Sequence, residues 1–111
     1  MKKIIGLILI LLPVSLFAQQ MNIISFNIRY NNPGDGENAW INRKDMVAGL
    51  LQFHDPDMFG LQEALHGQIL EIEEELPEYK WFGVGRDDGD KAGEFCPVFY
   101  RPDKFILLEK G

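Results

Sequence analysis

The chain has one cysteine, Cys96, so it cannot form an internal disulfide, and we expect this side chain to be a small buried hydrophobe within a strand. It also lacks an excess of basic residues, because its formal net charge is −6. A surface of that sign repels polyanions, so a phosphate-bearing ligand would need a bound cation beside it. An ordinary acidic surface explains the same composition without any ligand. No repeat, low-complexity tract or linker divides the sequence, which predicts one structural unit.

The sequence has no apolar run long enough for a typical membrane span, which needs about 20 residues. Its longest such stretch, Ile4 to Phe17, is shorter and contains Pro13; two lysines precede it and Ala18 follows. This arrangement is typical of a secretory signal peptide over residues 1–18, although the residue three before the cut is a leucine instead of a small residue. An uncleaved anchor or a buried N-terminal helix is the alternative. We expect a secreted or periplasmic protein without a stable membrane anchor.

The remaining chain, residues 19–111, alternates between strand and helix patterns. Ile24, Phe26 and Ile28 alternate with polar residues, as in a half-buried strand, and an apolar stripe at helical spacing stops at Pro77. These patterns predict strands at 22–30, 58–62, 79–84, 95–100 and 104–108, and helices at 43–54 and 65–76, the first with Asn42 as its N-cap. The order β-α-β-α-β-β-β predicts an α/β (α+β) fold with helices on one face of a mixed sheet, whose other face needs a cover.

Two polar side chains stand where such a sheet presents groups to a cleft. Asn27 lies on the first expected strand, and Glu63 directly follows the second. A carboxylate and an amide oxygen suit a hard divalent ion such as Mg²⁺, which completes its shell with water and phosphate oxygens. A solvated glutamate and a hydrogen-bonded strand asparagine explain the same residues without a metal.

Four blocks of sequence, in order, carry a family resemblance: Ser25-Phe26-Asn27-Ile28-Arg29-Tyr30, Gly60-Leu61-Gln62-Glu63, Gly85-Arg86-Asp87-Asp88-Gly89, and Gly93-Glu94-Phe95 leading to Phe99-Tyr100-Arg101. Together they resemble the endonuclease/exonuclease/phosphatase family, which includes relatives of pancreatic deoxyribonuclease. The resemblance implies a four-layered α/β/β/α sandwich. It also implies hydrolysis of phosphodiesters or phosphomonoesters with a divalent ion, Mg²⁺ or Mn²⁺.

The resemblance also implies roles for individual residues. Glu63 matches the metal-binding glutamate, and Asn27 matches an asparagine that lies at the phosphate and the metal. Glu94 matches a glutamate that pairs with a histidine on the catalytic side and orients it. Arg29 and the loop at Arg86 could border the same cleft, although a pairing of Arg29 with a neighbouring carboxylate and simple turn chemistry in the loop are the alternatives.

The family's later blocks are absent from the sequence: a Ser-Asp-His block with the general-base histidine and an Asp-x-Asn block do not occur. Neither histidine matches that motif; we expect His54 at a helix C-terminus and His66 as a solvated residue at a helix start, with a cleft-facing His66 as the alternative. We therefore expect residues 19–111 to be the N-terminal portion of the domain, truncated after about its fifth strand, and to be inactive alone.

The function that these observations favour is an exported, Mg²⁺-dependent hydrolase of phosphate esters. The sequence leaves its substrate open among nucleic acid, sugar phosphates and phospholipids, and leaves its oligomeric state open too. The alternative is a catalytically silent, exported binding or interaction module on the same scaffold.

Overall fold

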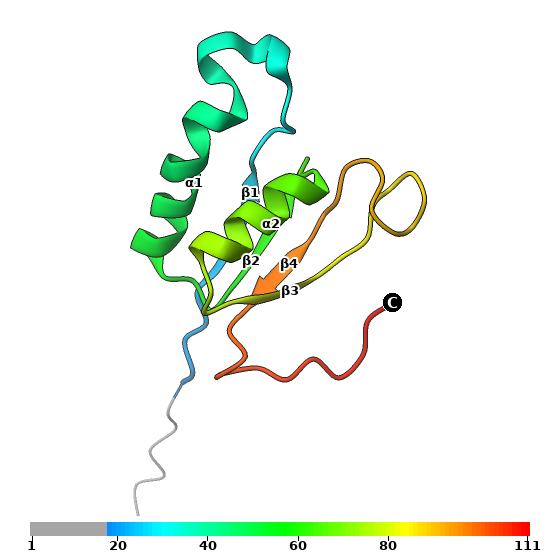
Figure 1. Cartoon of the computed structure of the whole chain (residues 1–111). Coiled ribbons are helices and arrows are strands. Elements are labelled where there is room, and N and C mark those ends of the chain that lie inside the picture. Colours follow the sequence, from blue (N-terminus) through cyan, green and yellow to red (C-terminus); the bar gives the residue numbers. More distant parts are fainter. Residues whose placement is uncertain (1–17) are drawn as a thin grey trace, which may run out of the picture.

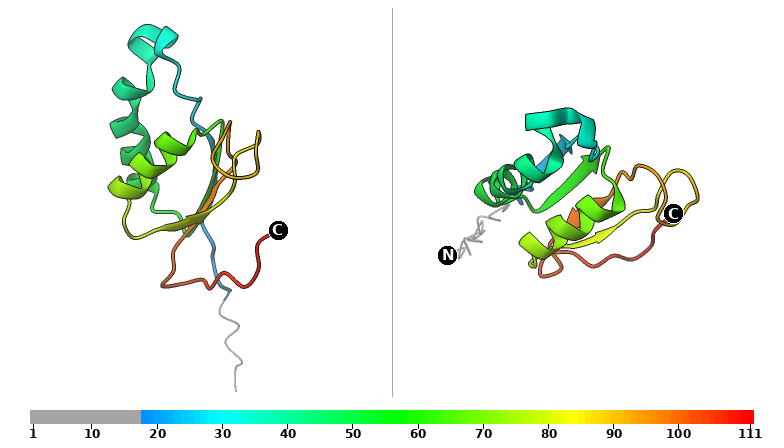
Figure 2. Two further views of the ribbon diagram at one scale, coloured as in Figure 1. Left: turned by 45° about the vertical axis from the view of Figure 1, so that its right-hand side comes forward. Right: turned by 45° about the horizontal axis from the view of Figure 1, so that its top comes forward.

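The computed structural model describes residues 18–111, and the expected signal peptide lies outside this range except for Ala18. Within it, a four-stranded mixed sheet has the strand order β1-β2-β4-β3, with both α-helices on one face (Figures 1 and 2). The elements, in chain order, are β1 (Ile23–Asn27), the 3₁₀ segment η1 (Pro33–Asn38), α1 (Trp40–His54), β2 (Met58–Gln62), α2 (His66–Glu75), β3 (Lys80–Phe82) and β4 (Val98–Tyr100). No helix among these residues is long and apolar enough to cross a membrane.

Most expected elements are present, and three expectations are wrong. Residues 104–108 do not form a strand; the carbonyl of Arg101 instead accepts hydrogen bonds from the amides of Lys104 and Phe105, which closes a turn. Helix α1 begins at Trp40 instead of residue 43, so Asn42 lies inside the helix and is not its N-cap. Cys96 is exposed and lies just before β4, because β4 begins only at residue 98.

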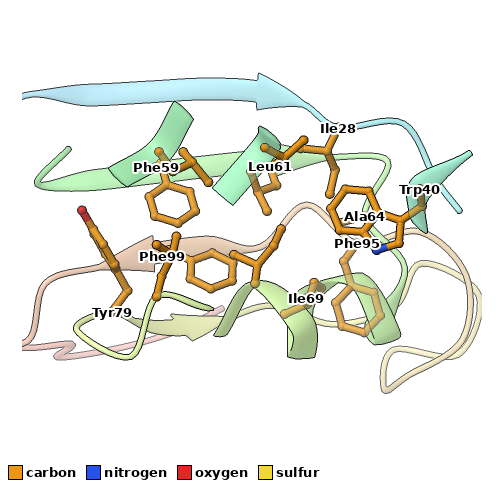
Figure 3. Close-up of a cluster of buried hydrophobic side chains, with 13 residues drawn as sticks. Ile28, Trp40, Phe59, Leu61, Ala64, Ile69, Tyr79, Phe95 and Phe99 are labelled. Atoms are coloured by element: carbon orange, nitrogen blue, oxygen red, sulfur yellow. The ribbon is translucent and has the colours of Figure 1, made fainter. Parts of the chain in front are cut away.

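The hydrophobic core lies between the sheet and the two helices (Figure 3). Directly paired residues of neighbouring strands point to the same face of a sheet. Phe59 of β2 pairs with Phe99 of β4, and their rings stack with centroids 4.6 Å apart. Phe26 of β1 pairs in parallel with Leu61 on the same, helix-covered face. This register leaves Asn27 and its neighbour Gln62 on the opposite face.

The face opposite the helices is partly lined by the last residues of the chain. A cavity of about 200 Å³ lies between side chains of the sheet and the segment 105–107. Ile106 and Leu108 of this end remain 84% and 92% exposed. The apolar pattern that predicted a fifth strand therefore reflects a segment that lies against the sheet face instead of joining its edge.

Asp57 ties this C-terminal segment to the start of the sheet. Its side chain is nearly buried, accepts a hydrogen bond from the amide of Asn22 at 2.8 Å and forms an ion pair with Lys104. The hydrogen bond from Lys104, followed by the one from Asn22, lowers the pKa of Asp57 below its ordinary value. A carboxyl group with a lowered folded-state pKa stabilises the fold only while it is ionised.

We predict that Asp57→Asn lowers the free energy of unfolding at neutral pH, since it removes the charge that Lys104 meets. The difference from wild type should shrink as the pH falls below about 4, where the unfolded-state carboxyl begins to hold its proton, and vanish below the lower folded-state pKa. Urea unfolding at several pH values measures it, with the exposed Asp103→Asn as control. A difference that stays constant down to the lowest pH would contradict this assignment.

Candidate functional site

Asn27 and Glu63, the two residues predicted to share a site, lie next to each other. Strands β1 and β2 are parallel neighbours, with Asn27 opposite Gln62, so both strands end at the same edge of the sheet. The side-chain amide of Asn27 donates a hydrogen bond to Oε1 of Glu63 at 2.9 Å. The pairing expected from the sequence is therefore present as a direct contact.

Glu63 is aimed by a β-bulge at the end of β2. The amide of Leu61 donates to the carbonyl of Pro97, and the next bridge joins Ala64 to Phe95. The two residues Gln62 and Glu63 therefore lie opposite the single residue Cys96. Glu63 has a left-handed backbone, with φ of 55°, which costs a residue other than glycine about 1–2 kcal/mol. Bulges of this kind redirect a side chain and are common beside active sites. Here the bulge turns the carboxylate toward Asn27.

The orientation of Asn27 is set by its own turn. Its side-chain oxygen accepts a hydrogen bond from the backbone amide of Arg29 at 2.9 Å, and only an oxygen can accept that bond. The NH₂ group must therefore face Glu63. Asn27 consequently orients one oxygen of the Glu63 carboxylate, and its expected contact with metal and phosphate stays a prediction.

The donor groups at this edge suit an ion such as Mg²⁺, which needs few protein ligands. They do not suit an ion that is enclosed by protein ligands alone. Among residues 18–111, no group of three or more His, Cys, Asp or Glu residues could hold a metal by itself. Mg²⁺ commonly uses only one or two protein carboxylates and keeps water and phosphate oxygens in its other positions. Glu63 supplies one such carboxylate, and its second oxygen is left over from the contact with Asn27.

Glu94 is brought next to this edge by the chain just before β4. The amide of Phe95 donates to the carbonyl of Ala64, which directly follows Glu63, at 2.7 Å. Because Phe95 points into the core, Glu94 points away from it. Its carboxylate lies 3.2 Å from a guanidinium nitrogen of Arg86. The expected partnership of Glu94 with a histidine stays a prediction, and in this structure its partner is an arginine.

Proteins of known structure resemble this chain in both fold and sequence. The structure superimposes on an endonuclease/exonuclease/phosphatase from Bacteroides vulgatus with a TM-score of 0.78 and 48% identity, over 80% of this chain and 34% of that one. It matches the mannosyl-6-phosphatase of Bacteroides thetaiotaomicron VPI-5482 with a TM-score of 0.79 and 41% identity, over 83% of this chain and 35% of that one. Over most of its length, the chain is similar in fold and sequence to endonuclease/exonuclease/phosphatase family proteins.

A curated protein shows a similar resemblance. The CCR4-Not complex 3'-5'-exoribonuclease subunit Ccr4 of Emericella nidulans is 33% identical over 82 residues, which is 65% of this chain and 12% of that protein. No protein-family model matches the chain. The chain spans about a third of the length of the matched structures. The expected α/β class is confirmed as part of the endonuclease/exonuclease/phosphatase fold, with four strands in place of five.

The loop that carries Arg86, Asp87 and Asp88 is held by hydrogen bonds within its own turn. One oxygen of Asp88 accepts hydrogen bonds from the amides of Asp90 and Ala92 at 2.8 and 3.0 Å. These bonds, that from Ala92 foremost, lower the pKa of Asp88. Arg29 is similarly occupied, because Asp35 holds it through two hydrogen bonds of 2.7 and 2.8 Å. For both Asp88 and Arg29, the structure favours the structural alternative over a free phosphate contact.

The two histidines have different surroundings. His54 is the last residue of α1 and is exposed, as expected. His66 begins α2, but its ring stacks on Phe95 with centroids 5.7 Å apart and lies edge-on to Trp81. The imidazole of His66 therefore belongs to an aromatic cluster and is only half-exposed, instead of being the solvated residue that we expected.

The sequence analysis missed Gln68, which is 2% exposed and hydrogen-bonds to the backbone after both β1 and β2. A signal was present, since position 68 lies three residues after Leu65 and four before Ile72 and so falls on the buried stripe of α2. A glutamine on an apolar stripe calls for hydrogen-bond partners, because burying an unpaired amide is costly.

We predict that Gly85→Ala displaces the loop that carries Glu94, because a Cβ atom there would lie 2.2 Å from the carbonyl oxygen of Ala92. The expected loss of stability is about 1–3 kcal/mol. Gly89→Ala is the matched control. An added Cβ atom there has open space, so the only cost, about 1 kcal/mol, comes from the positive φ of residue 89. Hydrogen exchange of the Phe95 amide, which donates to Ala64, should accelerate only in Gly85→Ala. Equal exchange in both variants would contradict the prediction.

Proposed function

We propose that this chain carries part of the active site of an exported, divalent-metal-dependent phosphoric ester hydrolase. The observation that carries the proposal is the hydrogen-bonded pair of Asn27 and Glu63, at the adjacent ends of two parallel strands. The carboxylate is held in a left-handed bulge, whose cost is typical of a site kept for function.

Each residue has a separate task in this proposal. Glu63 holds Mg²⁺ or Mn²⁺, and Asn27 keeps one carboxylate oxygen oriented. An ion held there would polarise the phosphate and would offset the negative charge that grows during phosphoryl transfer. Glu94, one residue from the strand bridge beside Glu63, orients a general base. No Ser-Asp-His block occurs in the 111-residue sequence, so we propose that this chain alone does not hydrolyse phosphate esters.

The substrate that we propose is a small phosphate monoester, such as a sugar phosphate. A mannosyl-6-phosphatase is 41% identical to this chain, compared with 33% for an exoribonuclease subunit. The net charge of −6 supports the same choice, because an acidic surface attracts a long polyanion less than a small ester. Export follows from the charged and apolar pattern of residues 1–18 and rests on the sequence alone.

The test uses the product of the complete reading frame that contains this chain. We predict that Glu63→Gln lowers kcat with Mg²⁺ on a sugar phosphate by at least about 100-fold, because the metal loses its carboxylate while the side-chain volume is kept. Mannose 6-phosphate, a diester and RNA are assayed side by side. Glu74→Gln, a change of the same chemistry on the exposed side of α2, should leave kcat unaltered.

Two results would contradict the proposal. One is undiminished hydrolysis by Glu63→Gln, which would remove the metal role from this carboxylate. The other is the absence of hydrolysis of all three substrates by the wild type, which would favour the binding-module alternative. A clear preference for RNA or the diester would replace the substrate class but keep the metal site.

A further inference from the structure

Gln68 joins the two turns that carry the candidate site. From α2, its Oε1 accepts hydrogen bonds from the amides of Asn31 and Leu65, both at 3.0 Å. Its Nε2 donates to the carbonyl of Arg29 at 2.9 Å. Arg29 lies two residues after Asn27, and Leu65 lies two residues after Glu63. One buried side chain therefore binds the backbone just beyond each of the two site residues.

The turns that Gln68 binds are not held by favourable local geometry. Arg29 and Glu63 both have left-handed backbones, each with φ of 55°, although neither is glycine. Such residues persist only where surrounding contacts hold them. The direct backbone link between the turns is the hydrogen bond from the amide of Ile28 to the carbonyl of Gln62, at 3.1 Å. Gln68 supplies three further bonds beyond that point.

We propose that Gln68 is a positioning residue that keeps Asn27 and Glu63 in contact by locking these two turns together. The inference rests on the proposed metal role of Glu63. Two backbone amides and one carbonyl converge on position 68. Only a side chain with both an acceptor and a donor can pair with all three groups. Methionine has nearly the same shape but leaves all three groups unpaired, and glutamate would set a carboxylate against the carbonyl of Arg29.

The test compares Gln68→Met with Ile72→Val, a buried apolar change one turn further along the same helix that removes no hydrogen bond. Mn²⁺ affinity of the complete protein is measured by electron paramagnetic resonance of the free ion, beside urea unfolding. Changes in residues that orient metal ligands commonly weaken affinity by about 10–100-fold. We expect about a 10-fold loss for Gln68→Met and none for Ile72→Val, whatever stability each loses. Equal affinities in Gln68→Met and wild type would overturn the inference.

A second readout does not depend on metal. In the metal-free protein, the NMR signals of the Asn27 side-chain amide report its hydrogen bond to Glu63, and exchange of the Asn31 and Leu65 amides reports the bonds to Gln68. The Asn27 signals and the exchange rates of both amides should change in Gln68→Met and stay constant in Ile72→Val. Unchanged Asn27 signals would refute the positioning role.

The same readout separates two failures. If the wild type binds no Mn²⁺, the proposed function fails, and the Asn27 signals still decide the role of Gln68. If Gln68→Met does not fold, Gln68→Asn keeps donor and acceptor but shortens their reach by one methylene. The same losses are expected for it, and wild-type affinity together with wild-type Asn27 signals would overturn the inference.

Discussion

The parallel pairing of β1 with β2 is the constraint on which the rest of the site depends. In a parallel pair, both strands end at the same edge, so residues 36 positions apart in the chain come within hydrogen-bond distance. The pairing needs a crossover, which α1 provides while covering the helix side of the sheet (Figure 2). The contact between Asn27 and Glu63 is thus a consequence of topology before it is a matter of side-chain choice.

Local geometry then refines what topology brings together. The extra residue in β2 turns Glu63 toward Asn27, and the resumed pairing of Ala64 with Phe95 draws Glu94 to the same edge. The backbone conformations of these segments are less favourable than those of a regular strand. The polar network around Gln68, together with the bond from Arg43 to the carbonyl of Ile28, holds the irregular segment in place. A rigid turn is what a carboxylate needs in order to meet an ion at a fixed position.

The sequence predicts features that depend on local periodicity and fails where distant pairing decides. The bounds of β2 and the stop of α2 before Pro77 follow from apolar patterns and a helix breaker. The segment 104–108 has a strand-like pattern, but a strand also needs a partner, and the turn after Arg101 directs this segment elsewhere. Cys96 was misjudged for the same reason. Its exposure depends on the bulge opposite, which no local pattern reveals.

The distribution of charge supports the cation proposed for this edge. Two arginines lie near the candidate residues, but Arg29 is held by Asp35 and Arg86 lies against Glu94, so each positive group already meets a negative one. The groups that touch or frame Glu63 are amides, Asn27 directly and Gln68 through the backbone, which orient a carboxylate without neutralising it. The local charge at Glu63 therefore stays negative. A divalent ion held by Glu63, as proposed above, would reverse this local sign and so let a phosphate approach.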